Sequence, residues 1–377
     1  MADARGDLRT SDFDYALPAE LIAQVPSPLR GESRLLVVGG KEAKRQGGKE
    51  ATERRKDAKT QCEESFEDRH FSDLPELIPP GDLLVLNSTK VRHARLLGRR
   101  PSGAPAEVLL LHPGADDCWI AIGKPGSALK PGKRIDLGSG VAVETIEELA
   151  DGYRRVRILG ATAEEAMERL GKIPLPPYID RLPTADDAIR YQTVYAERPG
   201  SVAAPTAGLH FTPELLQSIR ERGVGIARID LEVGPGTFKP VEQEDFTLHP
   251  MHPERYEIPS EAAALVAETR ARGNAVWAVG TTVVRALESA ARGGVPQAGP
   301  GETRLMITPG YRFQVVDRLL TNFHLPRSTL LMLVAAFAGY EKTMAAYRLA
   351  VTRRYRFYSY GDAMLVERQR STVNGQR

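Results

Sequence analysis

The feature that most constrains the fold is a change of strand pattern in the first half of the chain. Between about residues 94 and 159, short strand candidates follow one another at regular spacing, separated by Gly or Pro turns. Such spacing is typical of a small barrel or sandwich. The candidates are residues 106–111, 119–123, 134–137, 141–147 and 153–158. We therefore predict a separate β-domain here.

The flanking sequence has the pattern of an α/β domain. An all-apolar run at residues 83–86 predicts a strand that is buried on both faces. Further on, apolar strands at 226–231 and 275–279 flank a helix at 260–272. This alternation favours an α/β domain, built here from both ends of the chain.

The domain boundaries follow from these two patterns. A chain of 377 residues is long enough for about two domains. We expect a discontinuous α/β catalytic domain at residues 1–92 and 160–377, with the β-domain inserted at 93–159. A polar, charge-rich stretch at 39–69 lacks an apolar period, and we expect it to be a mobile insertion.

Composition excludes several classes of protein. Charged residues make up 27% and hydrophobic residues 42%, as in soluble globular proteins. Cys62 and Cys118 are too few for a disulfide framework or a zinc site, and the apolar run at 330–338 is too short to cross a bilayer. We expect a cytoplasmic protein. Because the formal net charge is +2, affinity for nucleic acid would have to come from local patches.

Two segments of mostly small, hydroxyl-bearing and uncharged residues suggest two walls of one pocket. They are residues 199–212 and residues 320–329. Glycine-rich backbone can come close to a ligand because no Cβ intervenes. His210 lies in the first segment, where its pKa is open to its environment. It is the best candidate for a catalytic histidine, although a lone histidine is more often a structural hydrogen-bonding group.

A second glycine motif follows the predicted strand at 226–231. Gly234 and Gly236 would let backbone amides approach a ligand. A tight turn with Pro235 presetting φ is an equally good interpretation.

A Gly-Thr-Thr motif at residues 280–282 opens a predicted helix at 283–291. Amides and hydroxyls at a helix N-terminus suit a carboxylate or phosphate, although an ordinary threonine cap is the more frequent use. Arg285, one turn further on, could reach the same ligand as a carboxylate fork.

A histidine pair invites a metal hypothesis, which we reject. His249 and His252 are close in sequence, but Pro250 and Pro253 forbid the helix that would bring both rings to one face. A loop that carries acid and base groups to a pocket is the better interpretation.

Basic residues gather at several places. Residues 353–360 combine three arginines with tyrosines and a phenylalanine in a basic and aromatic edge that could contact RNA. Residues 92–95, 99–100 and 154–155 could line a phosphate track. A solvated face, or a cationic last helical turn, is an equally ordinary explanation.

Many short runs, taken in order, match one known family. They are residues 13–15, 17–18, 21–24, 33–36, 73–75, 81–87, 89–91, 191–212, 236–238, 251–252, 280–282, 309–311, 317, 320–333 and 360–364. They span nearly the whole chain. The chain closely resembles the S-adenosylmethionine:tRNA ribosyltransferase-isomerase family of queuosine biosynthesis.

The resemblance implies both a reaction and a fold. The ribosyl part of S-adenosylmethionine, a substrate here, would be transferred and isomerised onto 7-aminomethyl-7-deazaguanine at the tRNA wobble position, giving epoxyqueuosine and releasing adenine and methionine. The implied fold class is α/β, a discontinuous three-layer α/β domain with an inserted small antiparallel β-barrel. Neither a prosthetic group nor a metal is expected, and we expect a monomer.

This chemistry requires a base near the 5′ carbon beside the sulfonium and a proton donor for the departing adenine. Candidates for these roles, or for orienting one of these groups, are His210, His252, His324, Asp317 and Asp362. Candidates for binding S-adenosylmethionine are Thr206, Gly208, Gly234, Gly236, Thr237, Gly280, Thr281, Thr282, Arg285 and Asn322, of which Thr281, Thr282 and Arg285 would suit the methionine carboxylate. Candidates for binding tRNA are Lys90, Arg92, Arg95, Arg354 and Arg356.

The sequence departs from the family pattern at two places, and two alternative functions stay open. Glu232 stands where the family usually has a histidine, so a carboxylate base becomes conceivable, and the 39–69 insertion is longer than usual. An S-adenosylmethionine-dependent RNA methyltransferase would share substrate and partner, but the expected Gly-rich loop after a first strand is not visible. A non-catalytic RNA-binding module would leave the uncharged segments unexplained.

Overall fold

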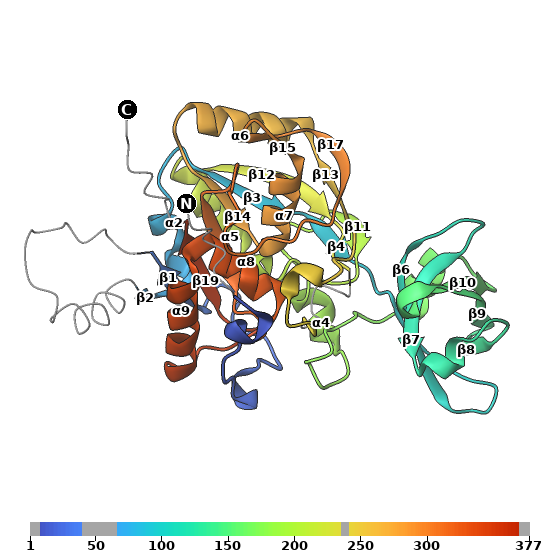
Figure 1. Cartoon of the computed structure of the whole chain (residues 1–377). Coiled ribbons are helices and arrows are strands. Elements are labelled where there is room, and N and C mark those ends of the chain that lie inside the picture. The colour runs from blue at the N-terminus through green and yellow to red at the C-terminus, as the bar shows by residue number, and fades with distance from the viewer. Residues whose placement is uncertain (1–7, 40–65, 235–240, 369–377) are drawn as a thin grey trace, which may run out of the picture.

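The computed structural model describes residues 8–39, 66–234 and 241–368. A larger α/β domain carries a small β-domain at one side, and the chain runs out to the β-domain and back again (Figure 1). The mixed α/β fold predicted from the sequence is confirmed.

A nine-stranded mixed sheet forms the centre of the larger domain. In spatial order its strands are β17 (Gly299–Thr303), β13 (Glu254–Ile258), β12 (Gly225–Leu231), β3 (Leu83–Asn87), β14 (Val276–Val279), β18 (Arg318–Asn322), β19 (Ala363–Glu367), β1 (Arg34–Val38) and β2 (Phe66–His70). Strands β12, β3, β14 and β18 run parallel, whereas β19 runs antiparallel to β18. The sheet thus joins strands from both ends of the chain.

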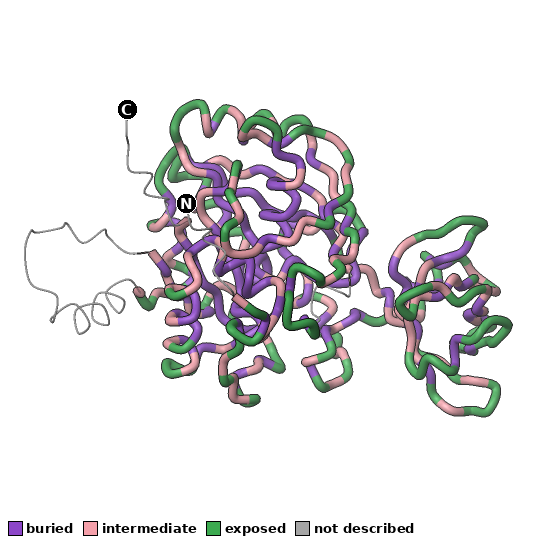
Figure 2. Tube along the Cα trace, in the orientation of Figure 1, coloured by how far each residue is buried: buried purple, intermediate pink, exposed green. Residues whose placement is uncertain are grey.

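Alternate residues of the central strands point to opposite faces, and both faces are apolar. In β3, Leu83 and Val85 belong to one core cluster while Leu84 and Leu86 belong to another. Helices α6 (Ser260–Ala271), α7 (Thr281–Ala290), α8 (Thr329–Ala338) and α9 (Tyr340–Thr352) contribute to the first cluster. Helices α2 (Leu74–Leu77) and α5 (Pro213–Glu221) contribute to the second. The buried trace accordingly follows the central strands (Figure 2).

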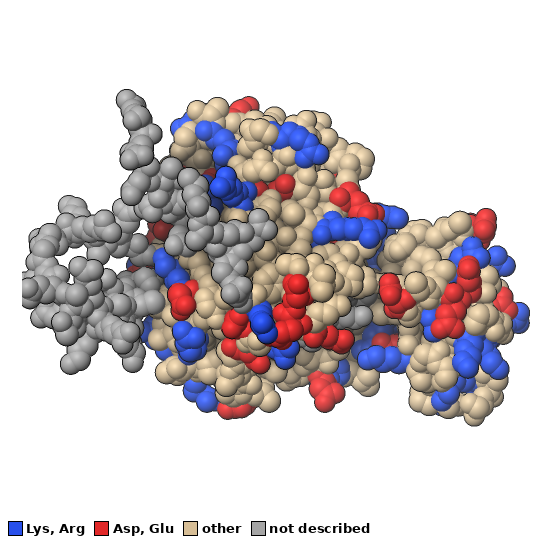
Figure 3. Space-filling view, in the orientation of Figure 1, with Lys and Arg blue, Asp and Glu red and all other residues tan. Residues whose placement is uncertain are grey.

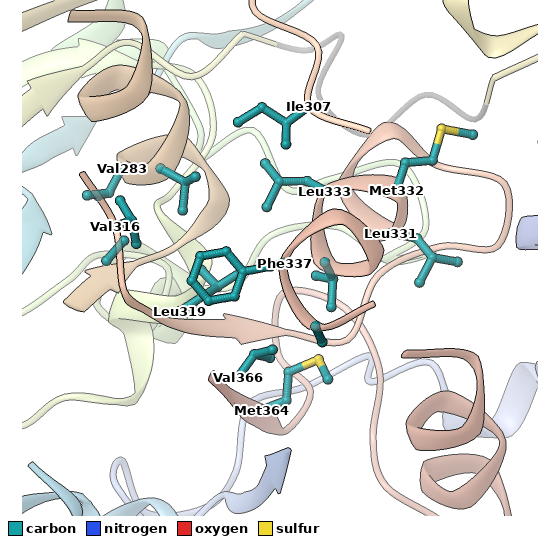
Figure 4. Close-up of a cluster of buried hydrophobic side chains, with 14 of the residues drawn as sticks. Val283, Ile307, Val316, Leu319, Leu331, Met332, Leu333, Phe337, Met364 and Val366 are labelled. Carbon is teal, nitrogen blue, oxygen red and sulfur yellow. The ribbon is translucent and has the colours of Figure 1, made fainter. Parts of the chain in front are cut away.

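Helix α8 is buried along most of its length. The Ser328 hydroxyl accepts a hydrogen bond from Leu331 N at its start, and Gly339, at φ 91°, follows its end. Phe337 lies beside Leu319 of β18 (Figure 4). This packing fixes the segment between β18 and α8, which borders the site described below.

The β-domain is a closed six-stranded barrel. Its strands are β5 (Arg95–Arg99), β6 (Pro105–Pro113), β7 (Trp119–Lys124), β8 (Arg134–Gly138), β9 (Val141–Glu148) and β10 (Arg154–Leu159). Five of the six coincide with strands predicted from the sequence. The prediction missed β5, because two arginines and a glycine in a five-residue segment hide its alternation.

Shorter elements connect the two domains and fill the loops. Parallel strands β4 (Thr89–Val91) and β11 (Arg198–Ser201) lie where the chain passes toward the barrel, and β15 (Ala291–Arg292) pairs with β16 (Val295–Pro296). Helix α3 (Ala163–Leu170) follows the barrel, and α4 (Ala185–Arg190) lies further along. Within the described ranges, no helix is long and apolar enough to cross a membrane.

One predicted boundary is wrong. The sequence predicts that the polar insertion extends to residue 69, but Phe66–His70 form β2, an edge strand antiparallel to β1. Sequence pattern missed it because an exposed edge strand needs no apolar period; Asp68 instead pairs with Arg34 and Arg353. Residues 40–65 of the insertion lie outside the described residues.

Candidate functional site

The candidate site lies at the carboxyl ends of the parallel strands, where open α/β sheets usually bind ligands. Strands β14 and β18 are parallel neighbours, so the Gly280 motif after β14 and Asn322 at the end of β18 reach the same edge. Because β19 is antiparallel to β18, its first residue, Ala363, pairs with Asn322 there. The sheet thereby gathers segments that are far apart in sequence.

A small cavity of about 40 Å³ opens at this edge. Six residues predicted as site residues line it: Thr206, Gly280, Thr281, Thr282, Asn322 and His324. Its other walls are mostly apolar, with Tyr178, Tyr358 and Ser359 among them. We call this cavity the small pocket.

Two buried polar atoms are unsatisfied in residues that line the small pocket. Thr282 is 7% exposed and Asn322 is 2% exposed. In the part of the chain that the structure describes, neither Thr282 Oγ1 nor Asn322 Oδ1 has a hydrogen-bond partner. Buried polar atoms without partners are rare, and at a cavity they are available to bind a ligand or water.

The N-terminus of α7 adds donors to this pocket. Its N-cap is Gly280, at φ 93°, which brings no capping side chain. The first amides of α7 therefore have no intrahelical partner, and the helix dipole places partial positive charge there.

The carboxamide of Asn322 has a fixed orientation. Its Nδ2 donates to the Tyr358 carbonyl at 3.2 Å and lies 3.1 Å from His210 Nε2. Since a carbonyl can only accept, the NH₂ group must face this side. The Oδ1 atom is left as the unsatisfied acceptor.

His210 is buried but does not line the small pocket. Its Nδ1 lies 2.6 Å from Ser33 Oγ, and its ring stacks on Phe71 at 4.9 Å between centroids. It borders a separate hollow beside Arg30 and Arg356. Burial, reinforced by Arg356 and Arg30, lowers the pKa of His210 to about 3, so the ring is neutral near pH 7.

His324 is the histidine that does line the small pocket. Its Nε2 lies 2.9 Å from Thr321 Oγ1, and its backbone N–H donates to the Tyr347 hydroxyl at 3.1 Å. Burial lowers the pKa of His324 to about 3, so this ring is also neutral near pH 7.

A much larger cleft of about 1170 Å³ lies between the barrel and the α/β domain. Tyr153 lines it from the barrel, and Glu232 and His252 line it from the larger domain. Val233 and Leu330 line both this cleft and the small pocket, so the two cavities adjoin. We call this space the interdomain cleft.

The two neighbouring histidines meet at this cleft. His252 Nδ1 lies 3.4 Å from the Tyr153 hydroxyl, a contact that bridges the two domains. The pKa of His249 is lowered, first by burial and then by His252. Among the described residues, no group of three or more His, Cys, Asp or Glu side chains could hold a metal ion.

Arg285 lines the cleft, as does Gly234. The Arg285 guanidinium forms an ion pair with Glu254, and the two side chains are 5% and 4% exposed. Arg285 Nε donates to the Leu305 carbonyl at 3.0 Å. Within the described ranges its Nη2 has no partner. The predicted carboxylate fork is thus largely engaged by a protein carboxylate.

The two predicted aspartates lie at different places. Asp362 accepts from the backbone amides of Arg34 and Arg356 at 3.0 and 2.8 Å, near the small pocket. Asp317 precedes β18 and accepts from Val276 N at 3.1 Å. It is therefore a full strand, roughly 16 Å at about 3.3 Å per residue, from Asn322. The described partners of both carboxylates are amides and arginines rather than histidines.

Two more glycines, Gly208 and Gly236, were predicted to bind S-adenosylmethionine. Gly208 is packed against Tyr195, whose hydroxyl would lie 2.1 Å from an added Cβ, so packing alone requires glycine there. Gly236, together with Thr237, lies outside the described residues.

The residues predicted to bind tRNA lie in two separate regions. Lys90, Arg92 and Arg95 lie where β4 leads into the barrel, whereas Arg354 and Arg356 follow α9. Near the first region the pKa of His93 is lowered by burial and then by Lys90 and Lys172, which indicates local positive potential. On the face drawn in Figure 3, basic and acidic side chains are interspersed over both domains.

Sequence analysis did not predict every lining residue. Tyr358 and Ser359 belong to a run interpreted as a basic and aromatic edge, so a signal existed but pointed to RNA. Tyr178 lies in an irregular segment before α4, where no periodicity or motif marks it.

Comparison with known proteins places these features in a family. The family model for queuosine biosynthesis proteins matches residues 10–366. An S-adenosylmethionine:tRNA ribosyltransferase-isomerase of Anaeromyxobacter dehalogenans is 49% identical over 96% of this chain and 100% of the relative. One from Pelotomaculum thermopropionicum is 50% identical over 95% of this chain and 100% of the relative.

A solved structure gives the same result. The crystal structure of S-adenosylmethionine tRNA ribosyltransferase from Thermotoga maritima is 37% identical, covers 94% of this chain and 99% of its own, and superposes with a TM-score of 0.51. With a family model over nearly the whole length and relatives close to half identical, the chain belongs to the queuosine biosynthesis protein family.

Proposed function

We propose that this chain is an S-adenosylmethionine:tRNA ribosyltransferase-isomerase. In this reaction the ribosyl part of S-adenosylmethionine moves to 7-aminomethyl-7-deazaguanine at the tRNA wobble position, giving epoxyqueuosine, adenine and methionine. The observation that carries the proposal is near-half identity to relatives of that name over their full length. The adjoining pocket and cleft supply space for a small substrate beside a large one.

In this proposal the two substrates meet where the small pocket opens into the interdomain cleft. S-adenosylmethionine would contact Thr206, Gly280 and Thr281 at the strand ends, with Gly234 and Arg285 on the cleft side. The modified nucleotide would enter the cleft, whose volume of about 1170 Å³ can admit a base and its sugar.

Proton transfer needs groups on these walls. A base must take the proton from the 5′ carbon beside the sulfonium, and a donor must assist departing adenine. We propose His324 in the small pocket and His252 in the cleft as the first candidates. Glu232, also in the cleft, is an alternative base.

For tRNA we propose contacts through the basic residues beside the barrel. Lys90, Arg92 and Arg95 lie where β4 leads into the barrel, and Arg354 and Arg356 would contact the tRNA in a second region, after α9. Phosphate contacts of this kind make affinity steeply salt-dependent.

We further propose the finer architecture implied by the family. A discontinuous three-layer α/β catalytic domain, residues 1–92 and 160–377, would bind S-adenosylmethionine, and the barrel at 93–159 would help hold tRNA. We propose that the enzyme works in the cytoplasm as a monomer.

Product analysis tests the proposed function. The protein is incubated with S-adenosylmethionine and tRNA carrying 7-aminomethyl-7-deazaguanine, and small products are separated by chromatography. Free adenine and methionine in equal amounts, with tRNA gaining the ribosyl mass, are expected; tRNA with unmodified guanine is the matched control. S-adenosylhomocysteine as product would instead indicate a methyltransferase, and unchanged substrate a binding module.

A further inference from the structure

The small pocket presents an unusual set of polar groups. Among the described side chains that line it, Asn322 Oδ1 is an unsatisfied acceptor and Thr282 Oγ1 is an unsatisfied hydroxyl, beside the first amides of α7. Within the described ranges, none of its lining residues is Asp, Glu, Lys or Arg. We propose, on the basis of the proposed function, that this pocket binds the amino-acid end of S-adenosylmethionine. Asn322 Oδ1 accepts from its α-ammonium, Thr282 and α7 donate to its α-carboxylate, and His210 is the positioning residue that holds Asn322.

The charge of the pocket matches that of a zwitterion. A ligand group of net charge would be desolvated here with no opposite charge to compensate it. An α-amino acid end has one positive and one negative group and no net charge. The partial positive charge of the α7 N-terminus suits its carboxylate, and an amide oxygen suits its ammonium.

The amino-acid end is the smaller end of the substrate and suits the smaller of the two cavities. A cavity of about 40 Å³ is far smaller than the interdomain cleft of about 1170 Å³. Adenosine would therefore lie toward the cleft, past Val233 and Leu330, which both cavities share. The sulfonium would lie between the two ends, near the Tyr178 and Tyr358 rings, which can stabilise a cation.

The role of His210 follows from its hydrogen bonds. Asn322 Nδ2 can only donate, so His210 Nε2 accepts, and the neutral ring carries its proton on Nδ1 and donates to Ser33 Oγ. This tautomer keeps the NH₂ group of Asn322 turned toward His210 and the Tyr358 carbonyl. Stacking on Phe71 holds the ring in place. His210 thus acts on the substrate through Asn322, since it borders a different hollow.

The test compares three ligands by calorimetry, with unmodified tRNA present. S-adenosylhomocysteine carries both groups, its analogue without the α-amino group lacks the ammonium, and 5′-methylthioadenosine lacks the whole amino-acid end. Asn322→Ala should weaken S-adenosylhomocysteine about 10- to 100-fold, as expected for a hydrogen bond to a charged group, and leave the other two within about twofold. Thr282→Ala should weaken S-adenosylhomocysteine and the des-amino analogue alike. Asn87→Ala, which removes a buried asparagine whose Nδ2 donates to the Leu231 carbonyl, is the control and should change none of the ratios.

His210 is tested by kinetics as well. His210→Ala should raise KM for S-adenosylmethionine and reduce the preference for the amino-bearing ligand, while turnover at saturating substrate stays within a few-fold. His210→Gln, which can still accept from Asn322, should restore most of the preference. If saturated turnover instead falls by two orders of magnitude or more while the preference stays intact, His210 is catalytic and its positioning role is overturned.

The affinities of the three ligands for wild-type protein alone decide whether the pocket holds the amino-acid end. If it binds S-adenosylhomocysteine no more tightly than the des-amino analogue, the ammonium site is wrong even if no variant folds. If no adenosyl compound binds at all, the proposed function itself fails. If all three bind equally, the proposed function survives and this inference does not.

Discussion

Two histidines in this protein are neutral because they are buried, and their neutrality affects stability. Both His210 and His324 have a pKa of about 3 in the folded chain. An unfolded histidine titrates near pH 6.5, so between about pH 6.5 and 3 the unfolded chain binds more protons than the folded chain. Stability therefore rises with pH in this window and is lost as the pH falls through it.

We predict that His324→Asn makes stability less sensitive to acid. Between pH 7 and 5.5, one buried neutral histidine should account for about 1 kcal/mol of the lost free energy of unfolding. Urea unfolding at both pH values measures this difference in wild type and variant. His112, a partly exposed side chain of β6, is the control as His112→Asn. An equal acid-induced loss in wild type and His324→Asn would mean that His324 is not buried and neutral.

At the scale of elements, the ion pair between α7 and β13 connects the helix of the small pocket to the outer part of the sheet. Arg285 and Glu254 are both almost fully buried. Breaking a buried ion pair by removing one partner is strongly destabilising, whereas replacing both partners with apolar residues is often nearly neutral.

We predict that Arg285→Met lowers the free energy of unfolding by about 3–5 kcal/mol. The double variant Arg285→Met, Glu254→Leu should recover most of this loss. Arg304→Met, which breaks an exposed pair with Glu302, should change stability by less than about 1 kcal/mol. Urea unfolding of the ligand-free protein gives all three values. Additive losses in the double variant would show that the pair does not act as a unit.

The β1–β2 hairpin allows a test of the polar insertion. Val38 of β1 pairs with Phe66 of β2, so the chain ends of the connection lie side by side. We predict that replacing residues 41–64 with a short Gly/Ser linker changes the free energy of unfolding by only about 1 kcal/mol, because closure entropy varies slowly with loop length. Substrate binding should be unchanged. Insoluble protein, or loss of binding, would assign the insertion a role, whereas removing β2 as well should destabilise the fold.

At the scale of the whole molecule, sequence predicts what depends on local pattern. The buried strand at 83–86 and five barrel strands were predicted because apolar periodicity and turns mark them. Thr281 and Thr282 were singled out because they open a predicted helix after a strand, and Asn322 because it lies in an uncharged segment. All three line the small pocket.

What sequence could not supply is the direction of each side chain. His210 and His324 lie in similar uncharged segments, yet only His324 borders the small pocket. Asp317 and Asn322 are five residues apart, but they lie at opposite ends of strand β18. The cleft depends on how barrel and α/β domain pack, which no local pattern encodes.

The central claim is that S-adenosylmethionine spans the two cavities and presents its ribosyl group in the interdomain cleft. A crystal structure of the protein with bound S-adenosylhomocysteine tests this most directly. We predict that the α-ammonium lies within hydrogen-bonding distance of Asn322 Oδ1, the carboxylate at Thr282, and the adenosine in the cleft. Adenine in the small pocket, or a nucleoside bound away from both cavities, would contradict the account.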